Sequence, residues 1–391
     1  IMSEINSSNF KKEHGDLAPD LVGVTELTSP YFFVPPSGTT AERPEDCEPG
    51  TLRFNTDIGS LEIFRGKLMG WEQIQRTENQ YLGGGTGSNT GTGVRGLGMA
   101  GTDYGSTSSN RIEFLTIPTL GNMQEFGDTT VSTRQGTGFS SRTRAVHVGG
   151  YDGSSKLNVI DFVTISSTGD ATDFGDLAAG RIGFPSGNAN QTRGIIFAGE
   201  YNSGNTNAIN YVTIAETGNA IDFGDASNAY QNGYAGASPT RGVFAGGRSP
   251  SYLNVIEFIT FATTGNAQDF GDLSVGKRGG PNGTASNPTR MILPGEDKSG
   301  DVITNVIEFL TIATTGNTID FGDMTEVKQT VCAMFSSTRG VLSGGYTPSS
   351  PNQTEVIEFI EIATTGNGTD FGDGVQTNSG RAGASSGHGG L

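Results

Sequence analysis

Side chains that could perform chemistry recur in this chain at a regular spacing. The tripeptide Phe-Gly-Asp occurs six times, at residues 126–128, 174–176, 223–225, 270–272, 321–323 and 371–373. Asp320, which precedes one copy, completes the Asp-Phe-Gly tripeptide that binds metal in protein kinases. A kinase has a single copy, together with a strand lysine and a catalytic loop. Six copies therefore predict structural turns, each with a buried Phe, rather than a catalytic centre.

Six arginines repeat in the same way and match the six aspartates of Phe-Gly-Asp in number. They are Arg95, Arg144, Arg193, Arg241, Arg290 and Arg339. A catalytic group would not be needed six times in one chain. We therefore predict that these groups make charge-assisted hydrogen bonds from one repeating unit to the next, or from a unit to a turn.

Other patterns with chemical potential are isolated. Gly91, Gly93 and Gly96 have the spacing of a dinucleotide-binding loop, but no helix is expected to follow them. Cys47 and Cys332 lie in different regions, which predicts neither a disulfide framework nor a zinc site. The histidines are equally scattered, at His14, His147 and His388. The sequence thus predicts no catalytic residue, no metal site and no cofactor.

The spacing of Phe-Gly-Asp defines a unit of about fifty residues, because successive copies begin 48, 49, 47, 51 and 50 residues apart. Self-similarity at this period is typical of modules that bury their apolar faces only against their neighbours. The clearest copy predicts strands at residues 233–238, 240–247, 254–258 and 269–272. Gly265-Asn266 marks the turn before the fourth strand, since both residues tolerate positive φ.

The strand predicted at Asn305–Thr311 carries apolar side chains on both faces. Ile307 and Phe309 alternate with Val306 and Leu310. A sheet that packs between two neighbouring sheets needs this pattern, whereas a sheet with one solvated face does not. Four-stranded blades arranged radially meet the requirement. We therefore expect an all-β fold, in which residues 81–391 form a six-bladed β-propeller.

The two ends of the repeat region predict how the ring closes. Residues 94–101 match the second strand of a unit but lack a convincing innermost strand before them. Residues 379–386 match that missing strand and nothing more. We expect the C-terminal strand to complete the first blade and so to remove an open sheet edge. In an alternative assignment, residues 81–92 supply the innermost strand.

The repeating unit resembles a kelch-type propeller repeat. A Gly-Gly doublet closes the second strand at residues 149–150, 246–247 and 344–345, although the aromatic pair with Trp of metazoan kelch repeats is absent. Asn158–Ile165, followed by Thr-Gly and Asp-Phe-Gly-Asp, is similar to repeats of kelch-like virion structural proteins of marine tailed phages, notably those that infect cyanobacteria. The resemblance covers residues 90–391 and implies a phage structural protein.

Residues 1–80 have a different composition and no repeat. Alternating residues at 51–55 and 61–64, followed by Trp71, predict a small β-meander after an extended Pro-rich segment. An isolated meander is marginally stable, so we expect it to pack on another copy or another protein. The segment resembles one found near the attachment ends of phage tail and fibre proteins, which implies virion docking through Leu52, Phe54, Leu61, Ile63 and Trp71. The alternative is a hairpin without special function.

The loops after the Gly-Gly strands differ from unit to unit and are rich in Tyr, Ser, Asn and Gly. This composition is typical of adaptable recognition surfaces, although solvated loop tips would show it too. We therefore predict that any ligand is bound by the loop tyrosines Tyr104, Tyr151, Tyr201, Tyr252 and Tyr346.

Composition limits the partners. The net charge of −17 argues against nucleic acid, and the sequence contains neither an apolar run of membrane-spanning length nor a recognisable secretion signal. We expect a non-enzymatic virion protein made in the host cytoplasm, oligomeric in the particle, that binds tail proteins through residues 1–80 and a host glycan or protein through the propeller. The alternatives are a decoration, adaptor or tail-nozzle protein, and a propeller glycosidase, which would need two converging carboxylates.

Overall fold

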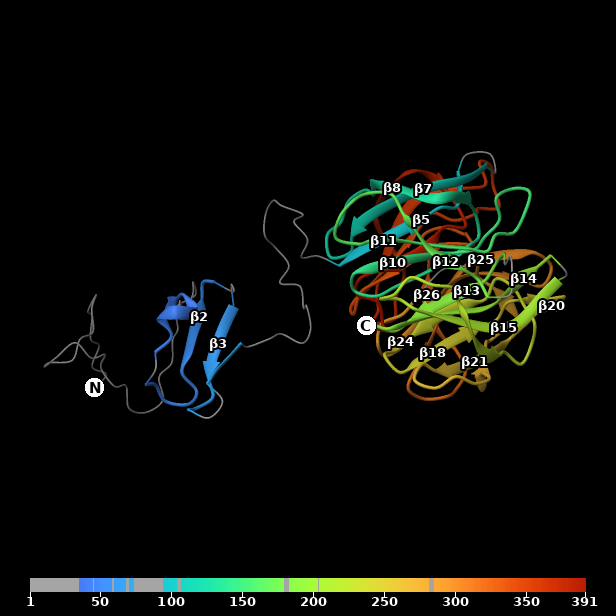
Figure 1. Cartoon of the computed structure of the whole chain (residues 1–391). Helices are drawn as coiled ribbons and strands as arrows, with labels where there is room; N and C mark the ends of the chain where they lie inside the picture. The colour runs from blue at the N-terminus through green and yellow to red at the C-terminus, as the bar shows by residue number, and fades with distance from the viewer. Residues whose placement is uncertain are drawn as a thin grey trace, which may run out of the picture. The chain divides into compact units, whose positions relative to one another are not determined.

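The computed structural model describes residues 35–44, 46–57, 60–67, 70–73, 94–103, 107–178, 183–202, 204–280 and 285–391. Within these ranges the chain consists of β-strands, their connections and one short 3-10 helix. The all-β prediction is confirmed. None of these residues forms a helix with the length and apolar character needed to span a membrane. The chain divides into two compact units, residues 1–80 and residues 81–391 (Figure 1).

The first unit is a sheet with the strand order β1–β2–β3–β4. β2 (Leu52–Asn55), β3 (Ser60–Phe64) and β4 (Trp71–Gln73) form the predicted antiparallel meander. β1 (Ser37–Gly38) pairs in parallel with β2, and the 3-10 helix Thr40–Glu42 follows it. The Pro-rich segment therefore contributes a short edge strand to the meander.

The second unit contains, within the described residues, six antiparallel sheets of four or more strands. We number them in chain order from β5. Sheets 2 to 4, in strand order, are β9 (Thr137–Ser140), β10 (Arg144–Val148), β11 (Val159–Thr164) and β12 (Thr172–Asp176); β13 (Ser186–Ala189), β14 (Arg193–Tyr201), β15 (Gly204–Thr213) and β16 (Ile221–Asp225); and β17 (Tyr234–Ala237), β18 (Arg241–Ala245), β21 (Val255–Thr260) and β22 (Gln268–Asp272).

Sheets 5 and 6 have the same antiparallel order. They are β23 (Lys277–Arg278), β24 (Arg290–Lys298), β25 (Val302–Thr311) and β26 (Ile319–Asp323); and β27 (Cys332–Phe335), β28 (Arg339–Ser343), β29 (Thr354–Glu361) and β30 (Thr369–Asn378). In sheet 5, however, β23 precedes the innermost position, where Ser286 bridges to Met291. A short hairpin in the sheet 4 loop joins β19 (Arg248–Ser249) to β20 (Ser251–Tyr252).

Sheet 1 is assembled from both ends of the repeat region. Its strands are β31 (Ala382–Ser385), β5 (Arg95–Met99), β7 (Thr107–Thr116) and β8 (Gln124–Thr133), with β6 (Thr102–Asp103) also on β7. β31 pairs with β5 so that Leu97 lies opposite Ala384, and β5 has β7 on its other edge. The predicted contribution of residues 379–386 is confirmed. The alternative assignment to residues 81–92 lies outside the described residues.

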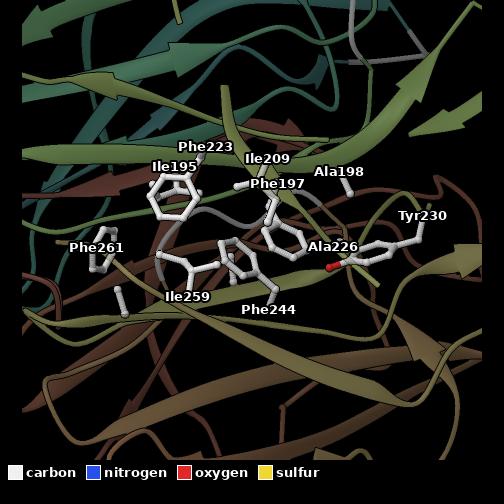
Figure 2. Close-up of a cluster of buried hydrophobic side chains, with 12 residues drawn as sticks. Ile195, Phe197, Ala198, Ile209, Phe223, Ala226, Tyr230, Phe244, Ile259 and Phe261 are labelled. Carbon is white, nitrogen blue, oxygen red and sulfur yellow. The ribbon is translucent and has the colours of Figure 1, made fainter. Parts of the chain in front are cut away.

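Each sheet packs against the sheets before and after it in the chain. Between sheets 3 and 4, the rings of Phe197 and Phe244 stack with centroids 3.6 Å apart (Figure 2). Similar buried clusters lie between sheets 1 and 2, 2 and 3, 4 and 5, and 5 and 6. A sixth cluster, which contains Leu115 and Val341, joins sheet 6 to sheet 1. The packing therefore forms a closed circuit.

The strand β25 buries apolar side chains on both of its faces, as predicted. Ile307 and Phe309 belong to the core shared with sheet 6. Leu310 points the other way and belongs to the core shared with sheet 4. Each sheet is therefore covered on both faces, which is why the strands lack a consistently polar side.

The Phe-Gly-Asp tripeptides lie at bulges within strands and not in turns, which corrects the prediction. In β12, Phe174 is buried as expected, and its ring meets Phe162 edge-on at 5.9 Å. The register shifts there: β11 advances by one residue, from Ile160 to Asp161, while the paired residue of β12 moves by two, from Gly175 to Asp173. The bulge exposes the Phe174 carbonyl, which accepts a hydrogen bond from Gly218 N–H of the next sheet at 2.7 Å. The tripeptide thus joins one sheet to the next.

The six repeated arginines also join neighbouring sheets. Arg144 lies over the Phe162 ring at 4.6 Å and donates hydrogen bonds to the carbonyls of Ile214 and Ala215 in sheet 3. The other five arginines make equivalent hydrogen bonds, and that of Arg339 to Ile117 joins sheet 6 to sheet 1. The prediction of bonds between units is confirmed, with backbone carbonyls as the acceptors in place of carboxylates.

Candidate functional site

A ring of backbone hydrogen bonds surrounds the centre of the second unit where the innermost strands begin. One residue per sheet donates its N–H to the carbonyl of the corresponding segment in the preceding sheet. All six donors have φ between 54° and 106°. They are Gln135, Phe184, Asn232, Gly280, Thr330 and Gly380. Non-glycine residues rarely adopt this left-handed conformation, and they do so where surrounding contacts compel them.

A cavity of about 290 Å³ lies inside this ring. We call the side of the second unit on which it lies the cavity face. The cavity lining combines carboxamide, hydroxyl, charged and aromatic groups. It is formed by Gln135, Phe184, Glu200, Gln231, Asn232, Arg278, Gly280, Gln329, Thr330, Tyr346 and Ser379. All six sheets, or the segments that lead into them, contribute to this lining; sheet 1 contributes through Ser379, which precedes β31. The cavity is therefore formed by the whole circuit.

The charged groups in the cavity lining already have partners. Lys156 Nζ lies 3.1 Å from the carboxylate of Glu200. Arg278 Nε donates a hydrogen bond of 2.6 Å to the carboxylate of Asp297, which is itself buried. Glu200 and Arg278 are therefore each neutralised by a neighbouring residue, and neither gives the lining a net charge.

The variable loops begin beside the cavity. The residues that follow the Gly-Gly doublets form backbone bridges to the residues that precede the ring donors: Tyr151 with Arg134, Arg248 with Gln231, and Tyr346 with Gln329. Glu200 bridges to Gly183 in the same way. The loops that the sequence singled out for recognition therefore lie on the cavity face.

Tyr346 is the predicted ligand-binding tyrosine that the structure places at the cavity. It contributes to the lining and is 37% exposed. Tyr104 lies outside the described residues. The predicted set therefore does not converge as a group, and the remaining three tyrosines have contacts elsewhere: Tyr151 in its own loop, Tyr201 at the core, and Tyr252 with the next sheet.

Tyr151 donates a hydrogen bond from its hydroxyl to Gly153 O at 2.8 Å, within its own loop. Tyr201 packs against the core between sheets 2 and 3, where burial raises the pKa of its hydroxyl. The Tyr252 hydroxyl is bound by two carboxylates of the next sheet, Asp297 at 2.9 Å and Asp301 at 3.0 Å. Burial and these two acceptors raise the Tyr252 pKa to about 12.

The opposite end of the central axis is crossed by residues 386–391. His388 Nε2–H donates to Ser140 O of sheet 2 at 2.7 Å, and Gly389 N–H donates to Ser286 O of sheet 5 at 2.8 Å. A Cβ atom on Gly390 would overlap the carbonyl of Ala189 in sheet 3. The carbonyls in these contacts lie at the ends of the innermost strands, whereas the cavity lies at their beginnings. The segment therefore closes the axis on the side away from the cavity.

The buried carboxylates are engaged within the sheets. Glu113 pairs with the fully buried Arg381 at 2.8 Å, and Glu358 pairs with Lys328 at 2.8 Å. Asp161 lies 3.3 Å from His147 and accepts hydrogen bonds from Thr130. In the described part of the chain, no three His, Cys, Asp or Glu side chains gather as they would around a metal ion. These acids link strands at equivalent positions, so they resemble structural elements more than a catalytic pair.

The sheet of the first unit has an open apolar face that contains four of the five predicted docking residues. Leu52 lies opposite Ile63, and Phe54 lies opposite Leu61, in neighbouring strands. Leu52 and Leu61 are exposed, and Phe54 and Ile63 are partly buried. We call these four residues the open apolar face. A row of apolar cross-strand pairs that stays exposed or half-exposed in the described part of the unit is a surface suited to association.

Trp71 lies on the other face of this sheet. It pairs with the buried Phe64, and the two ring centroids are 5.5 Å apart. Its indole N–H donates to Pro44 O. This face also buries Glu62, which accepts a hydrogen bond from Asn55 at 2.8 Å and pairs with Arg43. Trp71 thus contributes to the interior of the unit, away from the open apolar face.

Sequence reasoning missed the three glutamines of the cavity. Gln135 lies in the segment before sheet 2, Gln231 before sheet 4 and Gln329 before sheet 6. The intervals, 231 minus 135 and 329 minus 231, are 96 and 98 residues, which is close to two repeating units. Gln135 is itself a ring donor, whereas Gln231 and Gln329 each precede one, so the three do not share a repeat position and no periodic pattern marks them.

A scan of protein-family models finds none that matches this chain, and a search of curated proteins finds no relative. The function must therefore be inferred from the fold and from the cavity face.

Proposed function

We propose that the chain is a phage virion protein in which a six-bladed, kelch-like β-propeller binds the host surface and the first unit docks to the particle. The six-sheet circuit supports the propeller assignment, because each sheet has the four-stranded antiparallel order of a blade and sheet 6 packs back on sheet 1. The sequence resemblance to phage kelch-like repeats supports the virion assignment.

One observation carries the binding role. The repeated Phe, Gly and Arg residues are used in contacts between sheets, whereas the residues that differ between units surround a polar cavity on one face. A rigid scaffold that presents unrepeated residues around a hollow is the general arrangement of a binding site. The protein acts by binding and not by catalysis, because the carboxylates described above serve to hold strands together.

The open apolar face supports docking to other tail proteins. Burial of its four side chains would gain apolar contact that the first unit lacks, since Phe64 is the fully buried apolar residue among the described residues of that unit. Oligomerisation in the particle follows if copies dock around a symmetric tail. The acidic charge of −17 disfavours nucleic acid as the partner.

The test is adsorption to host cells. Purified full-length protein should bind the bacterial host and reduce infection by competing with the phage. Binding to neither cells nor their extracted surface polysaccharide would overturn the receptor role and leave a decoration, adaptor or nozzle role inside the virion, which the open apolar face alone would support. Release of reducing sugar from that polysaccharide by the pure protein would overturn the non-enzymatic assignment in favour of a glycosidase.

A further inference from the structure

We propose that the central cavity binds one uncharged sugar unit, such as the exposed terminal residue of a surface polysaccharide. This inference rests on the proposed receptor role and specifies the site and the chemical class of the ligand. Four features of the cavity support it: the carboxamides of the lining, an unsatisfied acceptor, the compensated charges and the volume.

The carboxamides give the cavity mixed hydrogen-bonding character. Gln135, Gln231 and Gln329 enter it from alternate sheets, so they approach the centre from three sides. Each amide offers two donor hydrogens and an acceptor oxygen. A hydroxyl group also donates and accepts, and a pyranose presents several of them around its ring. Thr330 and Ser379 add two hydroxyls to the same lining.

Asn232 supplies an acceptor that requires a partner. The residue is 6% exposed and lines the cavity, and its Oδ1 has no hydrogen-bond partner within the described part of the protein. A buried carbonyl oxygen without a donor costs about 1 to 3 kcal/mol. Because Oδ1 has less than 1 Å² of accessible surface, a ligand hydroxyl can donate to it only when the Asn232 side chain rotates toward the cavity, and that hydrogen bond would then remove this cost.

The compensated charges exclude strongly charged ligands. An anionic sugar would need a free cation, but Arg278 is engaged by Asp297 at 2.6 Å. A cationic ligand would need a free carboxylate, but Glu200 is engaged by Lys156 at 3.1 Å. Either ion would bind beside a pair that is already neutral, so it would give up its hydration without gaining a compensating charge. A neutral ligand does not incur this cost.

The volume and the aromatic residues define the size and the shape of the ligand. About 290 Å³ lies at the lower end of the range of roughly 300 to 1,000 Å³ that is usual for small-molecule pockets. The cavity therefore accepts a single ring and not an extended oligosaccharide. Phe184 and Tyr346 contribute apolar surface, against which the C–H groups of a pyranose can pack.

The experiment measures binding of defined sugars to the full-length protein by saturation-transfer NMR and titration calorimetry. The neutral probes are glucose, galactose, mannose and N-acetylglucosamine, and the charged probes are glucuronate and N-acetylneuraminate. We expect saturation transfer to at least one neutral sugar and none to the charged probes. Gln231→Leu should weaken the neutral sugar at least tenfold, because it removes the carboxamide while nearly retaining the volume.

Gln268→Leu is the matched control, since Gln268 is exposed on β22 away from the cavity lining. A second variant, Asn232→Gly, removes the orphan acceptor but tolerates the left-handed backbone at this position. It should also lose affinity while it keeps the native melting temperature. Absence of transfer to all four neutral sugars, preference for a charged probe, or equal affinity of Gln231→Leu and Gln268→Leu would overturn the sugar site.

Cell adsorption separates this inference from the proposed function. If wild type and Gln231→Leu adsorb equally well to host cells, the receptor role stands and the cavity is not its site. If the wild-type protein binds a neutral sugar but does not adsorb to cells, the sugar site stands and the receptor role fails. Both are supported if Gln231→Leu fails to adsorb and if addition of the bound sugar releases the adsorbed wild-type protein from the cells.

Discussion

Gly175 of sheet 2 lies directly against the carbonyl group of Gly218 in sheet 3. A Cβ atom on Gly175 would lie 2.5 Å from the Gly218 oxygen, and its φ of 146° is one that side chains other than glycine rarely adopt. The same contact joins Gly372 of sheet 6 to Gly121 of sheet 1. The glycine of Phe-Gly-Asp is therefore required by the close approach of two sheets.

The first prediction compares the two glycines of this contact. Gly175→Ala should destabilise the second unit by about 3 kcal/mol, because the methyl group must displace a backbone carbonyl and the φ is unfavourable. Gly218→Ala is the control, since a Cβ there would meet no atom within 4 Å. Urea denaturation, followed by far-UV circular dichroism, measures the free energy of unfolding of the two variants. Equal destabilisation by the two substitutions would contradict the contact as the cause.

The second prediction concerns the arginine that joins sheets 4 and 5. Arg241 donates hydrogen bonds of 3.2 Å to Ile312 O and 3.0 Å to Ala313 O and lies over the Phe258 ring at 4.7 Å. Arg241→Ala should lower stability by about 2 kcal/mol through loss of these contacts. Arg241→Lys should restore part of it, because the charge returns without the paired donors. Differential scanning calorimetry would refute the role if the melting temperature of Arg241→Ala equalled that of the wild type.

The repeat made much of the second unit predictable. Six copies of one pattern placed the strands, and the unmatched segment at residues 379–386 predicted that a C-terminal strand completes the first sheet. The register, in which Leu97 lies opposite Ala384, was not predicted. Local patterns did not show that Phe174 lies at a bulge, because a bulge depends on the register of two strands. Nor could they show that Arg144 donates to carbonyls about 70 residues away.

The candidate sites were predicted less well, for physical reasons. Tyr252 belongs to a class of residues common in recognition loops, but the carboxylates that engage it lie in the next sheet. The sequence pattern around Trp71 does not show which face of the sheet its side chain occupies. In the structure, its indole N–H donates to Pro44 O, so the segment around Pro44 covers that face. The cavity depends on residues such as Gln231 that converge only when the circuit closes.

The third prediction concerns pH. Burial lowers the pKa of His388 from 6.5 to about 4, and Nδ1 accepts a hydrogen bond from Gly390 N–H, which requires the neutral imidazole. Between pH 6.5 and 4 the unfolded chain binds a proton that the native protein does not, so stability falls as the pH falls through this interval. The loss attributable to His388 is roughly 3 kcal/mol by pH 4, at about 1.4 kcal/mol per unit.

His388→Gln isolates this contribution, because glutamine does not titrate and its amide can still donate to Ser140 O. Free energies of unfolding measured at several pH values between 7 and 4 should fall more steeply for the wild type than for the variant. Above pH 7 the difference between the two proteins should be independent of pH. Parallel curves across the whole interval would contradict the assignment, whatever the other acidic groups contribute.

The fourth prediction tests docking through the open apolar face. Leu61→Asp places a charge among Leu52, Phe54 and Ile63 and should prevent incorporation of the protein into particles. Leu120→Asp is the control, since Leu120 is an exposed leucine of the second unit. Complementation of a phage that lacks the gene, followed by mass spectrometry of purified particles, measures incorporation. Normal incorporation of Leu61→Asp would exclude this face as the docking surface.

The pairing of β31 with β5 has a consequence for synthesis in the cell. Leu97 and Ala384 are partners although they lie 287 positions apart in the sequence, since 384 minus 97 is 287. While a ribosome makes the intervening sheets, β5 exposes an unpaired edge and an incomplete core. The circuit can close only after the five intervening sheets have been made, and copies growing side by side on one message can donate β31 to one another. Slow, chaperone-assisted maturation and exchanged strands between neighbouring copies are the expected hazards of this design.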